Sequence, residues 1–356
     1  MNNKNIKLYL ELTSDLETSW IDLWNKSDHA HFFNSLGFFK TCLNVYGIND
    51  YIVVTYWQKK SLVGVLPLLK RKRYGINSYS LPGGKFMEKS MMLIKDNSPK
   101  IIKEMIDAIL ISDNFFLSET EFIVSKDMLN YYRNSLAATI SHSLYIDLEK
   151  NPFEALSKKN FNKIKNRITK NNKFLKHEHI QIIDNVILNL IFEIEQKSTK
   201  KLSGKEIFSK EINRSYFKSL VKQNPGIIVA DLIYYKREPF VYSLGILSKH
   251  DYIALHTAFL SEYKWIMPGK VLLFYMLPFY KNLGIKIFNF GRGDTNFKHE
   301  FTSKYVAQYD LYLSKHLIPI IWWRLINYIR RLRIIILKTL NSKDSEFLFR
   351  PLNYDK

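Results

Sequence analysis

The chain contains very little cysteine and none of the common metal or nucleotide motifs. Cys42 is the only cysteine in 356 residues, which excludes a disulfide within the chain. It stands in the apolar segment 38–43, a pattern typical of a buried free thiol, so we expect it in the core. The patterns CxxC, HExxH, GxxxxGK[ST] and GxSxG are absent. We therefore expect no metal, no phosphate loop and no serine-hydrolase elbow.

The nine histidines are scattered and suggest no catalytic triad. His177 and His179 flank Glu178, but residues two apart on a helix face different sides, so this cluster does not predict a metal site. His256 lies in an apolar strand pattern. It is a conceivable base, and a structural histidine is the more frequent outcome for such a position.

Long apolar runs are also missing. No segment offers about 18 uncharged apolar residues, the length that a membrane-spanning helix needs. The first 15 residues show neither an apolar run nor a cleavage pattern, so the sequence predicts no signal peptide. We accordingly expect a cytoplasmic protein.

Acidic residues are few relative to basic ones. Lys and Arg number 53 against 33 Asp and Glu, a formal net charge of +20. This excess favours an anionic partner: nucleic acid, a phosphate-bearing substrate or a membrane surface. A chain rich in Lys, Asn and Ile, as AT-rich genomes encode, also carries many lysines that are simply solvated. Both interpretations stay open from charge alone.

One arrangement of elements occurs twice along the chain. Two strands joined by a polar turn lead to a Pro-Gly step, then to a helical pattern and a further strand. In the first half these segments are 51–56, 62–69, Pro82-Gly83, 99–111 and 121–124. In the second half they are 227–234, 240–247, Pro268-Gly269, 269–282 and 286–290. Repetition over half the chain indicates two related domains.

Hairpins combined with crossover helices predict the fold class: α/β (mixed α+β), with a mixed central sheet in each domain. A short strand at 143–148 marks the boundary. We expect an N-terminal domain over 1–142, a C-terminal domain with the candidate site over 143–314, and a basic amphipathic helix and tail over 315–356.

Residues 151–175 form a strongly basic helical stretch. Asn151 is a good cap and Pro152 a good first helical residue, and the stretch carries seven basic residues that include Lys163 and Arg167. Such charge is usually solvated. The alternative is a helix that faces an anion: the phosphates of a substrate, a cofactor or RNA.

The segment 318–340 separates its residues into two faces. At 3.6 residues per turn, its basic residues share one half of the helix circumference and its aliphatic residues the other, with tryptophans near one end. This pattern predicts either an interfacial membrane helix or a C-terminal helix that packs on its domain. Arg324 and Arg333 interrupt the apolar run, so it should not span a bilayer.

The densest group of special residues lies in FNFGRGDTNFKHEF, residues 288–301. Gly291 and Gly293 let a backbone approach a ligand closely, and Lys298 stands between Phe297 and Phe301. A second segment, KWIMPGKVLL at 264–273, opens a helix with a Pro-Gly step, and the N–H groups of a helix N-terminus can bind an anion. We expect these two segments to form one site.

The 288–301 segment resembles the "fDfgrGd..YK..f" segment of the acyltransferase family named for cellulose biosynthesis (CelD/BcsL), within the GNAT superfamily. It is also similar to the FK..F segment of Fem-type peptidoglycan-bridge transferases. The run from Tyr263 through Pro268-Gly269 to Leu273 looks like the family step at which GNAT enzymes hold the cofactor pyrophosphate. Two features depart from the pattern: Phe297 replaces a usual tyrosine, and the loop [QR]xxGx[GA] is not intact at 264–270.

The resemblance covers about 30–312 and implies two tandem GNAT-like domains that move an acyl group from acetyl-CoA or another acyl-CoA to an amine. In these terms Lys298 stabilises the transition state, Asp294 is a base or a partner of Arg292, and Glu195 is a second base candidate. The expected cofactor-binding residues are Pro268, Gly269, Lys270, Lys264 and Arg292, and the expected substrate-binding residues are Phe297, Phe301, Lys163 and Arg167.

By the same resemblance the acceptor is an amino sugar of a cell-surface polysaccharide or of its nucleotide- or lipid-linked precursor. The helix at 318–340 would then hold the enzyme at the inner face of the cytoplasmic membrane. Two alternatives remain. One is Fem-like aminoacyl transfer from charged tRNA to a cell-wall precursor, although the helical-hairpin insertion of tRNA-using relatives is not visible. The other is a basic membrane or nucleic-acid adaptor without catalytic activity.

Overall fold

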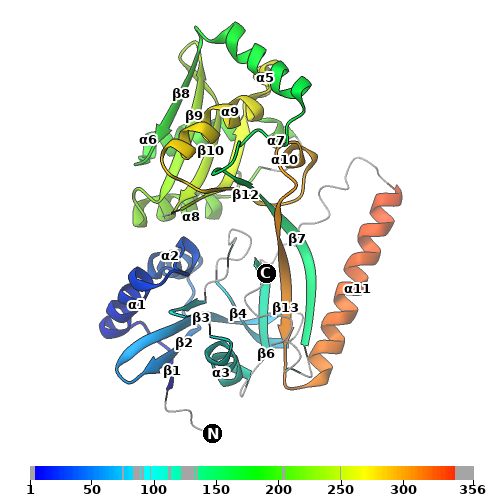
Figure 1. Ribbon diagram of the computed structural model, residues 1–356. Coiled ribbons are helices and arrows are strands. Elements are labelled where there is room, and N and C mark those ends of the chain that lie inside the picture. The colour runs from blue at the N-terminus through cyan, green and yellow to red at the C-terminus, as the bar shows by residue number, and fades with distance from the viewer. Residues whose placement is uncertain are drawn as a thin grey trace. The chain divides into compact units, whose positions relative to one another are not determined.

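A computed structural model describes most of the chain, drawn as a ribbon in Figure 1. The described residues are 5–73, 76–82, 89, 92–96, 98–110, 114–121, 132, 135–202, 204, 206–248 and 250–340. The chain forms two compact units. Unit 1 comprises 1–39, 48–142 and 307–356, and unit 2 comprises 40–47 and 143–306. The domain limits inferred from the sequence stay predictions.

Unit 1 is a mixed sheet with helices. Its elements are β1 (Ile6–Tyr9), α1 (Ser14–Lys26), η1 (Phe32–Asn34), the start of α2 (Leu36–Tyr46), β2 (Tyr51–Gln58), β3 (Ser61–Arg73), β4 (Ile76–Ser80), β5 (Leu93–Ile94), α3 (Pro99–Leu110), β6 (Asn114–Glu121), most of β13 (Tyr305–Leu313) and α11 (Leu317–Leu340). The strand order is β1-β2-β3-β4-β6-β13, with β5 on β3. β4 and β6 pair in parallel, and the other pairs described are antiparallel.

Helices cover this sheet with apolar faces. α1 buries Leu16, Trp20 and Leu23, which recur at helical spacing, and Thr13 caps its N-terminus by accepting from the N–H of Leu16. The Trp20 indole donates to the carbonyl of Asn34 over 3.0 Å, so this large ring is buried without an unsatisfied donor.

Unit 2 carries the second copy of the arrangement. Its elements are the end of β7 (Ser135–Asp147), α5 (Lys158–Asn171), β8 (Leu175–Ile180), α6 (Asn185–Gln196), α7 (Thr199–Leu202), α8 (Glu211–Gln223), β9 (Ile228–Tyr235), β10 (Glu238–Leu247), β11 (Asp251–Phe259), η3 (Ser261–Ile266), α9 (Pro268–Asn282), β12 (Ile287–Arg292) and α10 (Asn296–His299). The strand order is β7-β12-β11-β10-β9-β8. β11 and β12 pair in parallel and their neighbours are antiparallel.

Helices lie on both faces of the unit 2 sheet. On one face the Tyr280 ring of α9 packs at a tilt of 35° against the Tyr252 ring of β11, with ring centroids 4.4 Å apart. On the other face Glu195 of α6 contacts His256 of β11. Tyr252 and His256 are four residues apart and would share a face of a regular strand. The register shift between Leu244 and Gly245 leaves Leu255 as an extra residue, so His256 lies on the opposite face and β11 contributes side chains to both layers. The predicted mixed α/β class is therefore confirmed.

Both predicted hairpins form. β2 pairs with β3, and β9 with β10, each around a turn of two residues. Lys59, Lys236 and Arg237 adopt positive φ in these turns, as tight hairpins require. The helices predicted at 99–111 and 269–282 are confirmed as α3 and α9. The strand predicted at 121–124 lies outside the described residues except for Glu121, and so does the Pro82-Gly83 step except for Pro82.

Two further sequence predictions, on Cys42 and on the basic helix, have a clear outcome. Cys42 is fully buried, as expected. The basic helix, in contrast, does not start at Asn151-Pro152, where the chain forms turns. α5 starts at Lys158, because the hydroxyl of Ser157 accepts from the N–H of Asn160 and caps the helix there.

The segment around His177 and His179 is a strand, so the helical argument applied to it was wrong. In β8 residues two apart share a face, and both imidazoles contact the same carboxyl oxygen of buried Asp231, at 2.9 and 3.2 Å. The Tyr280 hydroxyl donates to the other oxygen over 2.6 Å. Burial alone would raise the pKa of Asp231, but these bonds hold it below its usual value.

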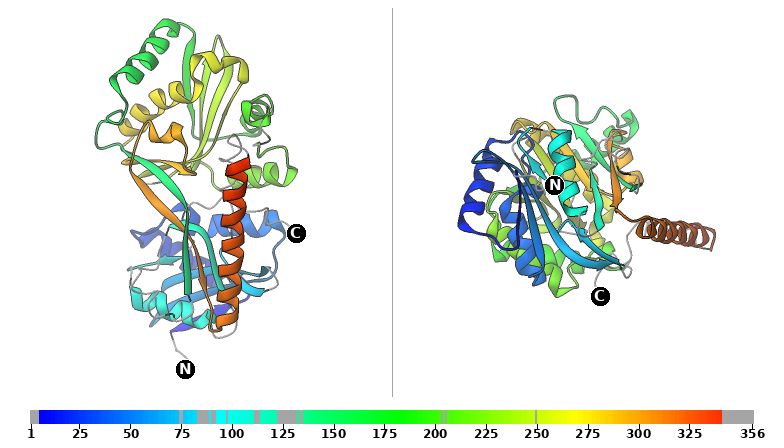
Figure 2. Two further views of the ribbon diagram at one scale, coloured as in Figure 1. Left: turned by 90° about the vertical axis from the view of Figure 1, so that its right-hand side faces the viewer. Right: turned by 90° about the horizontal axis from the view of Figure 1, so that it is seen from below.

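The expected C-terminal helix is present as α11, the long red helix of Figure 2. Ile320 and Trp323 are buried against Tyr312 of β13, with the two aromatic rings 4.7 Å apart. The opposite side leaves apolar side chains in contact with solvent: Leu317, Ile318, Ile321, Trp322, Leu325, Tyr328, Ile329 and Leu332. Within the described part of the chain, no helix has the length and apolarity to cross a bilayer.

Candidate active site

The site begins where two parallel strands part. β11 pairs with β12 over Asp251–Ile253 and Ile287–Asn289. Beyond this point the register between β12 and β7 shifts, and Arg292 of β12 pairs with Ser143 of β7. β11 is irregular here too: its register with β10 shifts between Leu244 and Gly245, a β-bulge that places Leu255 as the extra residue. The sheet therefore opens at the carboxyl ends of β11 and β12.

The opening is fixed by hydrogen bonds at the end of β12. The Asn289 side chain accepts from the Gly291 N–H and from the Ser143 hydroxyl, each over 2.7 Å. Gly291 and Gly293 adopt φ of 68° and 102°, which side-chain-bearing residues rarely adopt. These two positions thus require glycine for backbone reasons.

Lys298 holds the loop after β12 in place through hydrogen bonds. Its ammonium donates to the carbonyls of Gly291, Arg292 and Gly293 over 2.8, 2.9 and 2.8 Å. An ammonium group has three N–H donors, so these bonds match its whole donor capacity. The side chain holds the loop in shape and at the same time brings a positive charge to the edge of the opening.

The N-terminus of α9 lies beside this loop. Met267 adopts the left-handed conformation with φ 60°, and Pro268 then starts the helix with the fixed φ that suits a first position. The Phe297 ring covers the step, since a Cβ added to Gly269 would lie 3.3 Å from it. The two segments singled out in the sequence, 264–273 and 288–301, therefore meet in space.

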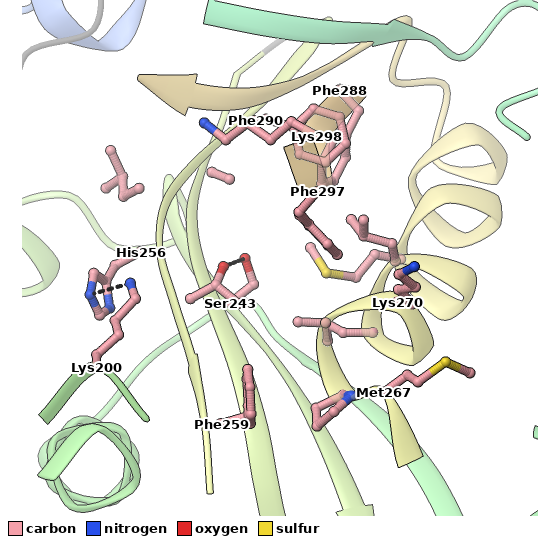
Figure 3. A pocket seen from close by; sticks show the side chains of 18 of the residues that line it. Lys200, Ser243, His256, Phe259, Met267, Lys270, Phe288, Phe290, Phe297 and Lys298 are labelled. Atoms are coloured by element: carbon pink, nitrogen blue, oxygen red, sulfur yellow. Dashed lines mark hydrogen bonds between the residues drawn. The ribbon is translucent and has the colours of Figure 1, made fainter. Parts of the chain in front are cut away.

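Together these parts enclose a cavity of about 540 Å³ in unit 2 (Figure 3). Its floor and one wall are apolar, formed by β11, β12 and α9, with Phe288 and Met276 among the fully buried side chains. Of the residues that the structure describes, five with a basic side chain border it and none with a carboxylate does: Lys200, Lys264, Lys270, Arg292 and Lys298. Lys270 bonds to Glu300, which offsets part of its charge. The arrangement suits a ligand with an apolar part and an anionic end.

A buried polar cluster reaches the cavity from the opposite face of the sheet. His256 Nε2 lies 2.9 Å from Glu195, and its Nδ1 lies 2.8 Å from the Tyr242 hydroxyl. Lys200 approaches the same Nε2 within 3.0 Å, as Figure 3 shows. Burial alone would raise the pKa of Glu195, but the bond to His256 and the N–H groups of Ile207 and Phe208 hold it below its usual value.

The structure brings together most of the residues expected at the site. Phe297 and Lys298 line the cavity. All five expected cofactor-binding residues line it as well: Pro268, Gly269, Lys270, Lys264 and Arg292. Phe301 is buried behind Phe297, with ring centroids 5.6 Å apart, and does not line the cavity. Glu195 is fully buried and reaches the cavity only through His256. The roles assigned to these residues stay proposals.

Three further expected residues, Asp294, Lys163 and Arg167, do not line the cavity either. Asp294 is exposed and forms an ion pair with His299. Lys163 is exposed on α5, and Arg167 lies over the exposed Trp265 ring at 5.9 Å. In contrast, Lys200 lines the cavity although the sequence analysis gave it no role. His256 lines it as well; the sequence analysis named it as a conceivable base but favoured a structural role.

No group of three or more histidine, cysteine or carboxylate side chains suited to a metal ion occurs among the residues that the structure describes.

Comparison with known proteins adds the family of the domain. Residues 162–299 match the model of the acetyltransferase (GNAT) domain, which covers unit 2 from α5 to α10. Residues 162–299 are therefore a GNAT acetyltransferase domain, and the chain is an acyltransferase. No curated protein sequence matches the chain significantly.

Solved structures share the fold at low sequence identity. FemX superposes with a TM-score of 0.64 and 11% identity, over 90% of this chain and 99% of its own. L-PGS from Bacillus licheniformis gives 0.53 and 14%, over 78% and 88%. A conserved protein of unknown function from Bacteroides thetaiotaomicron gives 0.52 and 11%, over 87% and 100%. The expected fold, two tandem GNAT-like domains, is confirmed.

Because Lys298 holds the loop after β12 through three hydrogen bonds, its removal should destabilise the protein. Lys298→Ala should lower the free energy of unfolding by about 2 kcal/mol, because three carbonyls lose a charged donor. The adjacent His299→Ala, which breaks only an exposed ion pair, should cost less than about 1 kcal/mol. Urea unfolding of both variants measures the difference. Equal, small losses would show that the lysine does not hold the loop.

The lowered pKa of Glu195 predicts that the free energy of unfolding depends on pH. Its native pKa is lowered, so the unfolded chain binds more protons at acid pH. The stability that Glu195 contributes is present above its unfolded pKa of about 4.3 and is lost as pH falls through the lower native value. In Glu195→Gln the free energy of unfolding should fall less steeply between about pH 5 and 3. Denaturant titrations at several pH values measure this slope, and an unchanged slope would contradict the assignment.

Proposed function

We propose that the protein is an N-acyltransferase that moves an acyl group from an acyl-CoA thioester to an amine. The cavity between the parted strands carries the proposal. Its apolar floor suits the acyl group and the uncharged arm of the donor, and its basic rim and the α9 N-terminus suit phosphates. Backbone groups of β11 beyond Ile253 are not paired with β12, so they can bond to the amides of that arm.

The donor phosphates fit the end of the cavity near Lys264, Lys270 and the N–H of Gly269. The next two N–H groups, of Lys270 and Val271, donate to the carbonyl of Met267. This end compensates for the missing GNAT loop pattern, because the helix N-terminus and the two lysines supply positive potential without the usual glycine-rich motif. Arg292 borders the same cavity from β12. Phe297 covers the Pro-Gly step and keeps its backbone away from bulk water.

Acyl transfer requires the amine nitrogen to bond to the thioester carbonyl carbon while the carbon–sulfur bond breaks. The amine must lose a proton, and the leaving sulfur gains one. We assign the proton-accepting role to the pair of His256 and Glu195, since His256 borders the cavity and Glu195 is fixed behind it by two backbone N–H groups. Lys298 contributes positive charge near the carbonyl oxygen as charge develops there.

For the acceptor we favour an amino sugar of a cell-surface polysaccharide or of its nucleotide- or lipid-linked precursor. The resemblance of the 288–301 segment to the cellulose-biosynthesis acetyltransferase-like family supports this choice. The basic rim of the cavity agrees with a phosphate-bearing acceptor. Fem-like transfer from aminoacyl-tRNA is the second candidate, favoured by the likeness of the fold to FemX and by the net charge of +20.

Thermal denaturation with CoA and acetyl-CoA tests the donor. A ligand at 100 times its dissociation constant should add about 2.7 kcal/mol of stability. Lys264→Ala combined with Lys270→Ala should weaken CoA binding at least tenfold, since two charges that border the cavity are removed. Lys286→Ala removes an exposed charge outside the lining and serves as the control. Stabilisation by charged tRNA but by no CoA compound would favour the second candidate, and stabilisation by neither would contradict both candidate donors.

We also propose that α11 contacts an anionic membrane surface. The helix has five basic residues and no acidic one, and its exposed side carries Trp322, Leu325 and Tyr328. This combination of positive charge, apolar area and aromatic rings suits the interface of an anionic bilayer. Such contact would place the enzyme beside lipid-linked acceptors.

Flotation with phosphatidylcholine vesicles, with and without phosphatidylglycerol, tests this contact. Binding should require the anionic lipid and weaken at high salt. Leu325→Glu should reduce binding about tenfold or more, because a side chain worth about 1.5–3 kcal/mol on burial is lost. Ile21→Glu on α1, at similar exposure, is the control and should bind as before. Equal binding of the two variants would argue against α11 as the contact.

A further inference from the structure

Aromatic rings lie on the surface of unit 2 beside the basic rim of the cavity. Trp265 of η3 is 46% exposed, and the Tyr235 ring at the end of β9 meets it edge-on, with ring centroids 5.8 Å apart. Tyr263, also of η3, packs against Tyr235 at 5.8 Å. We call these three residues the aromatic surface. Their mutual contacts hold the rings in place, while nearly half of Trp265 stays open to a ligand.

The aromatic surface adjoins the end of the cavity that suits the donor phosphates. Lys264 lines the cavity and is the residue before Trp265 in the chain. Ile266, the residue after it, is fully buried, and Met267 leads directly into α9. Trp265 is therefore fixed close to the α9 N-terminus, at the edge of the cavity.

α5 runs past this edge to the aromatic surface. Near the start of the helix Asn160 donates to Glu300 over 3.3 Å, and Glu300 also binds Lys270 of the cavity rim. The Arg167 guanidinium, seven residues further along α5, lies 5.9 Å from the centre of the Trp265 ring. Seven residues of α-helix rise about 10 Å, so α5 links the rim at Lys270 to Trp265 over a short distance.

Positive charge accompanies the aromatic surface. Arg167 lies over the Trp265 ring, and the Lys236 ammonium lies 5.7 Å from the centre of the Tyr235 ring. The Glu238 carboxylate accepts a bond from the Tyr263 hydroxyl over 2.6 Å, which takes up part of its charge. Aromatic rings with neighbouring cations suit a ligand that combines a flat ring with a phosphate, and a nucleotide is such a ligand.

The proposed donor carries a nucleotide in the matching place. With the acyl group and the uncharged arm of CoA in the cavity and its two linking phosphates at the rim, the adenosine and its ribose phosphate must lie outside the cavity. The surface that follows the rim after Lys264 is Trp265, with Arg167 over its ring. The order of chemical groups along the donor therefore matches the order of groups along the protein.

We propose that the aromatic surface binds the adenosine end of CoA, with the adenine ring stacked on Trp265 and the ribose 3′-phosphate bound to Arg167. The inference rests on the proposed function, which places the linking phosphates at Lys264 and Lys270. A guanidinium suits this phosphate because it offers paired N–H donors. Arg167, which the sequence analysis expected among the substrate-binding residues, thereby acts in recognition of the donor. The adenosine end takes no part in acyl transfer; it adds affinity and selects donors that carry a nucleotide.

Titration calorimetry of the full chain with CoA, 3′-dephospho-CoA and pantetheine 4′-phosphate tests the proposal. The second compound lacks the ribose phosphate and the third lacks the whole nucleotide, so affinity should fall about fivefold or more at each step. Trp265→Ala should weaken CoA and 3′-dephospho-CoA about tenfold and leave pantetheine 4′-phosphate unchanged, because the stacked base is lost. Arg167→Ala should weaken CoA about fivefold or more and 3′-dephospho-CoA by less than about twofold.

Two further variants serve as matched controls. Tyr305→Ala removes a ring that is 53% exposed and lies outside the aromatic surface, and Lys286→Ala removes an exposed charge outside the cavity lining. Both should bind the three compounds as the wild type does. Trp265→Phe keeps a ring for stacking and should retain most of the affinity that Trp265→Ala loses. Unchanged binding of pantetheine 4′-phosphate shows that the Trp265 variants fold.

The outcomes separate this proposal from the proposed function. Similar affinities for CoA and pantetheine 4′-phosphate, or wild-type binding of CoA by Trp265→Ala, would overturn the adenosine site and leave the acyltransferase proposal standing. Equal losses for CoA and 3′-dephospho-CoA in Arg167→Ala would overturn the phosphate contact, since the arginine would then only support the Trp265 ring. If Trp265→Ala weakens binding of uridine diphosphate and not of CoA, the surface serves a nucleotide-linked acceptor and the assignment to the donor is wrong. Binding of no CoA compound would contradict both proposals.

Discussion

The candidate site depends on the parting of β11 from β12 after Ile253. Two parallel strands that stay paired leave no backbone groups for a ligand between them, because hydrogen bonds occupy the facing edges of both strands. Here β12 turns towards β7, and β11 carries a bulge at Leu255. The opening gives a ligand access to backbone groups and to both faces of the sheet. Every residue to which we assign a role in acyl transfer borders this opening or supports one that does.

The two faces supply different chemistry. α9 covers one face and offers a helix N-terminus, apolar side chains and lysines, which suits a long phosphate-bearing donor. α6 covers the other face and holds Glu195 behind His256, which suits removal of a proton from an acceptor. With the donor on one face of the sheet and the acceptor on the other, the two can meet only where the strands part. Lys298 maintains that geometry by binding three carbonyls of the adjoining loop.

The sequence predicted the hairpins, α9, α11 and the meeting of two distant segments, since turn residues, apolar periodicity and the Pro-Gly step are local signals. It did not predict the partner of Glu195. That contact joins residues 61 positions apart through the sheet register, and a bulge is not visible in a single sequence. The error at His177 and His179 had a similar origin: the segment pairs with β9, and this tertiary contact decides that it is a strand.

Hydrogen exchange with and without CoA tests the central claim, that the opening between β11 and β12 is the donor site. The account predicts slower exchange of the amides at 254–259 and 269–273 when CoA binds, with no change in β8, which lies at the far edge of the sheet of unit 2. Protection confined to residues outside the cavity, or an equal response along all strands of unit 2, would contradict it.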